Sequence, residues 1–94
     1  MNKTELQKAR TSAESLLKRV EQIYKDTERK HEDIIDEFFD TTKSEEKNDI
    51  FKDFLFTNMK LHELVECRKE LISLCNRLKN IDTIRDRAKS NIQD

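Results

Sequence analysis

Apolar residues in the first forty positions of the chain recur at alternating intervals of three and four, which places them along one face of an α-helix. The repeat consists of Leu6, Ala9, Ala13, Leu16, Val20, Ile23, Thr27, His31, Ile34 or Ile35, and Phe38. From Ile23 to His31 it takes two successive steps of four, a stutter that locally unwinds a left-handed supercoil. The pattern predicts a helix over about residues 4–39, with Thr4 as its N-terminal cap.

A second repeat fills the C-terminal part of the chain, again with steps of three and four. It consists of Leu64, Cys67, Leu71, Leu74, Leu78, Ile81, Arg85, Ala88 and Ile92. The stretch before it, from Ile50 to Leu61, is apolar around much of a helix circumference. Together they predict a helix over about residues 45–92. Asp82 or Thr83 could interrupt it and cap a short third helix after Asn80.

The residues between the two repeats, 40–44, are Asp, Thr, Thr, Lys and Ser. Such side chains bond the local backbone and favour a turn, and the spacing of Thr42 and Glu45 fits a capping box. The chain contains no glycine and no proline, so one continuous helix is the alternative architecture. We favour the turn, because a lone helix of that length needs a partner along all of it.

The predicted fold class is therefore all-α, a long antiparallel helical hairpin that forms one domain over residues 1–94. We expect helix two to overhang helix one at Arg85–Asp94. Two helices bury only one stripe each, so we also expect two hairpins to dimerise into a four-helix bundle. The residues expected to form the line of contact between the helices, called the seam below, are Leu64, Leu71, Leu74 and Leu78 with Leu6, Leu16, Val20 and Ile23.

All five phenylalanines lie between positions 38 and 56, around the predicted turn. We expect Phe38, Phe51, Phe54 and Phe56 to form an aromatic cluster at the tip. Phe56 should face outward, because it lies about 150° from the centre of the neighbouring apolar face at about 100° per residue. The residues predicted to contact a protein partner are Phe38, Phe39, Phe51, Phe54, Phe56, Met59, Leu64, Leu71, Leu74 and Leu78.

The net charge of −1 conceals a strong segregation. Residues 1–30 carry a net +3, residues 31–66 a net −7 and residues 67–94 a net +3. In a hairpin this makes the end with both termini basic and the tip acidic, which favours antiparallel over parallel packing of two rods. Each arginine near the C-terminus stands beside an aspartate, so we expect no nucleic-acid partner.

Catalytic and metal-binding motifs are incomplete. Glu28 and His31 form the Glu-x-x-His motif of di-iron bundles, but Met59 stands where a second copy would need its glutamate before His62. His62 and Glu66 share a helical face and could hold a metal only weakly. A chain without glycine has no glycine-rich phosphate loop. We expect no cofactor, no metal and no enzymatic activity.

Cys67 and Cys75 are eight positions apart, about 12 Å along a helix, which is too far for a disulfide between them. We expect two reduced thiols. The chain has no apolar run of about 18 residues and no apolar segment like a signal peptide near its start. These features predict an intracellular, cytoplasmic protein that does not enter a membrane.

The function that fits these features is protein–protein interaction. We expect a self-associating hairpin, most simply a homodimer, that acts as a scaffold, adaptor or regulator through its apolar seam and acidic aromatic tip. One alternative is a subunit of a complex with another helical protein. Another is a small acidic inhibitor or secretion-associated protein that binds its target through the tip. Known secretion-associated hairpins carry a Trp-x-Gly turn, and this chain has neither residue.

Overall fold

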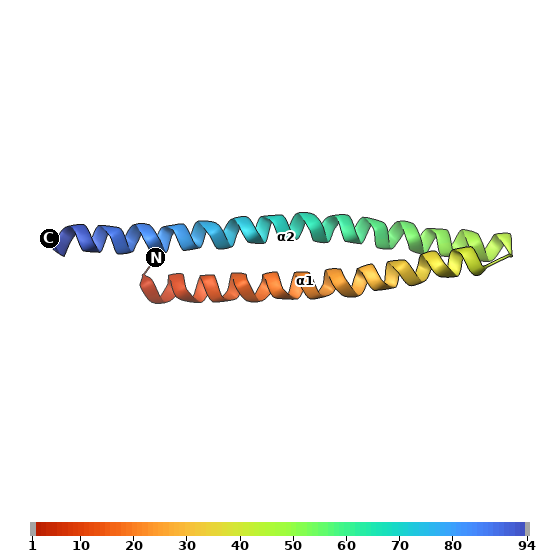
Figure 1. The fold of residues 1–94 in the computed structure, drawn as a ribbon, viewed down its shortest axis with the longest axis horizontal. Helices are drawn as coiled ribbons and strands as arrows, with labels where there is room; N and C mark the ends of the chain where they lie inside the picture. The colour runs from red at the N-terminus through yellow and green to blue at the C-terminus, as the bar shows by residue number, and fades with distance from the viewer. Residues whose placement is uncertain (1, 94) are drawn as a thin grey trace.

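The computed structural model describes residues 2–93 of the chain, with side chains described for residues 2–88. Two helices, α1 (Lys3–Asp40) and α2 (Ser44–Gln93), lie side by side and antiparallel (Figure 1). They form a rod with extents of 76 × 17 × 15 Å. The predicted all-α helical hairpin is confirmed, and the break at residues 41–43 excludes a single continuous helix.

Polar side chains mark both ends of α1. The Asn2 side-chain oxygen accepts a hydrogen bond from the Glu5 backbone amide at 2.8 Å. In return, the Glu5 carboxylate accepts one from the Asn2 backbone amide at 3.4 Å. Asn2, rather than the predicted Thr4, is therefore the N-cap. At the tip, the amide and the hydroxyl of Thr41 both donate to the Glu37 carbonyl, at 3.0 and 2.8 Å. This satisfies a carbonyl that the helix end would otherwise leave free.

The start of α2 differs by one residue from the predicted capping box. Its first turn is closed by the Lys47 amide, which donates to the Lys43 carbonyl at 3.0 Å. Lys43 therefore precedes the helix directly, and no hydrogen bond joins Thr42 to Glu45 among the described side chains. The two glutamates of the first turn still lie where the helix dipole favours negative charge.

The predicted third helix after Asn80 does not form, because α2 runs unbroken to Gln93. Both residues that could have capped it are engaged otherwise. The Asp82 carboxylate accepts a hydrogen bond from Arg10 of α1 at 2.6 Å, and the Thr83 hydroxyl donates to the Lys79 carbonyl one turn earlier. With no glycine or proline to stop it, the helix continues.

The seam of the hairpin follows one uninterrupted repeat of three and four on each helix. On α1 and its C-cap Thr41 it consists of Leu6, Arg10, Ala13, Leu17, Val20, Tyr24, Thr27, His31, Ile34, Phe38 and Thr41. On α2 it consists of Lys47, Ile50, Phe54, Thr57, Leu61, Leu64, Arg68, Leu71, Cys75, Leu78 and Asp82. Every one of these except Arg68 is buried or half-buried. A strict repeat of this kind keeps the same face toward the partner helix along the whole rod.

Three of the predicted seam residues are wrong. Leu16 and Ile23 are exposed, and their neighbours Leu17 and Tyr24 occupy the seam instead. Leu74 is likewise exposed, while Cys75 is half-buried. The predicted stutter disappears with this correction. When Tyr24 replaces Ile23 in the repeat, steps of four and three residues alternate along α1 as far as the tip. The register with Tyr24 is favoured because it alone continues unbroken along α1.

The longitudinal register is fixed by contacts near the termini and by contacts nearer the turn. Near the termini, the buried side chains of Leu6, Ala13 and Leu78 form one cluster. Nearer the turn, His31 Nδ1 lies 2.6 Å from Thr57 Oγ1. α2 is longer than α1 and extends past its start (Figure 1), as the overhang at Arg85–Asp94 predicted. The side chains beyond residue 88 and the whole of Asp94 lie outside the described part.

Candidate protein-interaction surfaces

Residues beside the seam form one row on each flank of each helix. Because the helices are antiparallel, the α1 row with Leu16 and Ile23 lies on the same flank as the α2 row with Leu74 and Ile81. We call this side flank A. The opposite side, flank B, carries the rows of Glu21 and Ile35 on α1 and of Phe51 and Val65 on α2.

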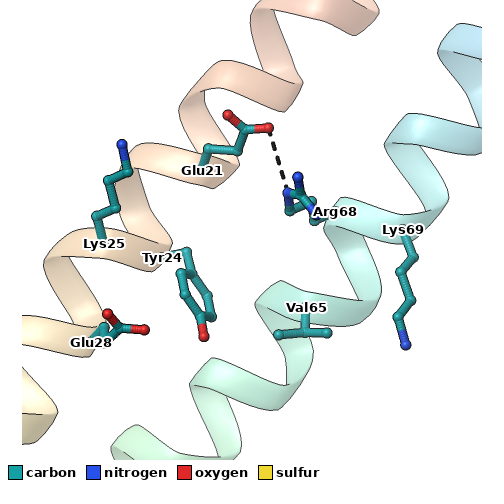
Figure 2. A pocket seen from close by; sticks show the side chains of 7 residues that line it. All are labelled: Glu21, Tyr24, Lys25, Glu28, Val65, Arg68 and Lys69. Carbon is teal, nitrogen blue, oxygen red and sulfur yellow. Dashed lines mark ion pairs between the residues drawn. The ribbon is translucent and has the colours of Figure 1, made fainter.

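Figure 2 shows the middle of flank B, where side chains of both helices border one shallow groove. Arg68 is a seam residue whose guanidinium turns outward to meet Glu21 at 3.5 Å. Tyr24 and Val65 supply the apolar part of the floor, and charged side chains surround them. The ion pair is half-exposed, so it contributes little to stability. The groove holds no pairing of nucleophile and base that would suggest catalysis.

Flank A carries an aliphatic surface in the half of the rod near the termini. Its large members are about half-exposed: Leu16 by 50% and Leu74 by 43%. Ile23 and Ile81 extend the same two rows by one heptad. The set Ala9, Leu16, Ile23, Cys67, Leu74 and Ile81 is called the basal patch below. Burial of such side chains normally stabilises a helix pair, yet here the partner helix does not cover them.

Flank B carries an aromatic surface in the other half, at the tip. An apolar groove of about 280 Å³ opens between the ends of the helices, and it is called the tip groove below. It is lined by Ile35, Phe38, Phe39, Phe51 and Phe54. Phe39 is 77% exposed and Phe51 is 48% exposed. The predicted aromatic cluster is therefore present in part, and it surrounds an open groove.

Ring contacts hold the tip groove together. Phe38 meets Phe39 edge-on at 5.9 Å between ring centroids, and Phe51 stacks on Phe54 at 6.1 Å. Phe38 and Phe51 connect the two helices at 6.4 Å, and the Lys47 ammonium lies 5.2 Å from the Phe38 centroid. Aromatic pairs and cation–π contacts of this geometry each stabilise by about 0.5–1.5 kcal/mol. The rings of the groove walls therefore already contact one another in the unbound hairpin.

The remaining predicted contact residues are divided between the inside and the outside of the hairpin. Leu64, Leu71 and Leu78 lie in the seam and are covered by α1. Phe56 and Met59 lie on the outer face of α2, away from the aromatic groove. The outward orientation expected for Phe56 agrees with its exposure of 76%. Phe56 is thus not part of the aromatic cluster to which it was assigned.

A short polar stretch separates the two apolar surfaces. The Thr57 hydroxyl donates to the backbone of its own helix, to the carbonyl of Asp53 or Phe54, so it accepts a hydrogen bond from His31 Nδ1. The His31 ring also stacks on Phe54 at 4.7 Å. These contacts give the histidine of the Glu-x-x-His motif a structural role. Among the described residues, no three potential metal-ligating side chains come together.

Neither cysteine takes part in a disulfide. Cys67 is exposed on flank A, while Cys75 is half-buried in the seam beside the Leu6, Ala13 and Leu78 cluster. No helix within the described residues is long and apolar enough to cross a membrane. Comparisons of the chain with models of protein families, with curated proteins and with solved structures gave no match.

The basal patch was missed in the sequence because its residues stand next to the seam residues. Leu16 precedes Leu17, and Leu74 precedes Cys75, so two overlapping repeats share these helices. The signal in the sequence was the presence of apolar residues in two adjacent rows of each helix. Two such rows predict an apolar face wider than one partner helix covers.

Proposed function

We propose that this protein is a non-enzymatic assembly module, a helical hairpin that self-associates and acts as a scaffold, adaptor or regulator. The observation that carries the proposal is the distribution of apolar side chains. Among the described residues, eleven large apolar side chains are exposed, whereas the buried hydrophobic core has five members. Contiguous exposed apolar surface is typical of interaction sites in soluble proteins.

The shape of the chain supports binding over catalysis. A two-helix rod offers long flanks and open grooves, whereas small-molecule sites are concave and enclose most of their ligand. Both grooves described above are open to solvent along one side. The free thiols fit a reducing, cytoplasmic compartment, where disulfides are rare.

The test is the absolute mass in solution, measured by light scattering behind a sizing column under reducing conditions over a range of concentrations. We expect a dimer or larger species whose mass rises with concentration. Leu74→Gln should lower the mass while leaving the helical circular dichroism unchanged. The matched control is Ser73→Gln, a neighbouring exposed position on the same helix that faces away from both flanks. A wild-type protein that stays monomeric throughout would contradict self-association.

A second candidate function is favoured by the tip groove alone. Its apolar lining lies in the stretch of net charge −7, so it fits a target that presents an apolar side chain within a basic surface. In that case the isolated hairpin would be a monomer, and it would act as a subunit of a complex or as an inhibitor of another protein. The mass measurement separates the two candidates, because the second predicts no growth with concentration.

A further inference from the structure

The two apolar surfaces lie on opposite flanks and in opposite halves of the rod. The basal patch occupies flank A near the termini, and the tip groove occupies flank B at the turn. Toward the tip, the rows of flank A become charged. The residues there are Lys30 and Glu37 on α1 and Asp53 and Lys60 on α2. Toward the termini, the α1 row of flank B consists of Glu28, Glu21 and Glu14, and the α2 row of Val65, Ile72 and Lys79. Flank A is therefore apolar over one half, whereas the basal half of flank B combines an acidic row with Val65 and the half-buried Ile72.

This arrangement argues against a symmetric dimer. A two-fold axis makes both copies use the same surface, and one flank does not hold both patches because they lie on opposite flanks. Pairing through the tip groove would place two stretches of net charge −7 against each other. Pairing through the basal patch would place two basic ends together and leave the aromatic groove uncovered. Full antiparallel overlap of two rods would set each apolar half against a charged half.

We propose that copies of this chain associate head to tail, with the basal patch of one molecule on the tip groove of the next, staggered by half a rod. The proposal rests on the self-association proposed above and specifies its geometry. Aliphatic side chains such as Leu16 and Leu74 then meet the open aromatic groove. The two segments of net charge +3 at the basal end of one molecule then face the segment of net charge −7 of the next. The same contact therefore pairs opposite charges and apolar surfaces.

The available area is sufficient for a specific contact. Half of a rod 76 Å long and 17 Å wide offers roughly 650 Å² per partner, or about 1,300 Å² in total, within the range of stable protein–protein interfaces. The contact leaves a free tip groove on one outer end and a free basal patch on the other. Because the two surfaces lie on opposite flanks, a further copy adds at each end and the assembly stays open.

The experiment uses two variants that each lose one surface without changing the charge. The basal-blocked variant is Leu16→Gln with Leu74→Gln, and the tip-blocked variant is Phe39→Gln with Phe51→Gln. Glutamine is a good helix former, and all four positions are exposed, so helicity should be retained. If a double variant loses its helical circular dichroism, the single changes Leu74→Gln and Phe39→Gln replace it.

The wild-type mass from light scattering should increase continuously with concentration and fall at high salt, because the contact joins opposite charges. Each blocked variant alone should be a monomer. An equimolar mixture should double in mass and stop there, since the basal-blocked chain keeps its groove and the tip-blocked chain keeps its patch. No other pairing of surfaces predicts rescue by mixing.

The failures are distinguishable. A wild-type monomer at every concentration overturns self-association itself, and the head-to-tail geometry with it. If the wild type associates but one blocked variant still dimerises alone, self-association holds and the head-to-tail geometry is wrong. Two monomeric variants that stay monomeric when mixed, while the wild type associates, overturn the geometry as well.

Discussion

The basal and tip halves of the rod share one heptad repeat but fill it with different residues. In the basal half, Leu6, Ala13 and Leu78 are buried together, and Leu6 is only 1% exposed. In the tip half Ile34 and Ile50 are also buried, but the seam contains rings and hydroxyls as well, and Phe51 at its edge remains 48% exposed. The same hydrophobic pattern therefore gives buried aliphatic side chains in both halves and an open aromatic groove only at the tip.

This difference assigns separate tasks to the two halves. The basal core holds the helices together by covering the side chains of Leu6, Ala13 and Leu78, and such burial stabilises the fold. The tip presents rings that already contact each other but still face solvent. Both halves also carry an uncovered surface, aliphatic beside the core and aromatic at the tip. Substitutions in the two halves should consequently separate folding from association.

The largest expected effect is the loss of a basal core side chain. Leu78→Ala should lower the free energy of unfolding by about 2–3 kcal/mol, because it removes buried methyl groups and leaves a cavity. Its matched control is Leu74→Ala, four residues earlier on the same helix, which should cost less than about 1 kcal/mol. Urea denaturation at the lowest workable protein concentration measures both. Equal costs would mean that the exposed row belongs to the folded core.

A smaller effect is expected where the two halves meet. Thr57→Val keeps the side-chain shape but removes the hydroxyl that accepts from His31, so it should cost about 1 kcal/mol. In combination with His31→Leu most of that cost should be recovered, because no polar group is then left without a partner. A double-mutant cycle by urea denaturation measures the coupling. Additive costs of the two changes would show that the pair is not coupled.

Most of the fold was predictable because local rules agree with one another. The absence of glycine and proline, the heptad spacing and the polar residues at 40–44 all predict two helices and a turn. The end of α1 and the start of α2 required no information about distant residues. What these rules do not contain is the choice between two adjacent rows on one helix.

That choice depends on the other helix. Leu16 and Leu17 are equally apolar, so only the partner decides which one is covered. The seam also contains Arg10, Tyr24 and Asp82, whose polarity hides them from a search for apolar residues. Arg10 pairs with Asp82 across 72 positions of sequence, a contact that no local spacing reveals. The position of the basal patch followed from this register and was therefore missed.

The ion pair at the basal end should have a modest effect. Arg10 and Asp82 meet at 2.6 Å with side chains 24% and 26% exposed, so Asp82→Asn should cost about 0.5–1 kcal/mol, less at high salt. Glu21→Gln removes the more exposed pair with Arg68 and serves as the control, with an expected cost near zero. Urea denaturation at low and high salt measures both. An equally large loss at Glu21 would contradict the ranking by exposure.

The smallest effect on stability is expected at Phe56, on the outer face of the tip half. Phe56→Asp should change the free energy of unfolding by no more than about 0.5 kcal/mol, since the ring is already 76% in solvent. Phe54→Asp, two residues earlier, should unfold much of the tip because its ring stacks on His31 and Phe51. Circular dichroism and thermal melting compare the two. If Phe56→Asp lowered helicity as much as Phe54→Asp, its outward position would be wrong. If it spared helicity but weakened association, the outer face of α2 would belong to the contact beside the tip groove.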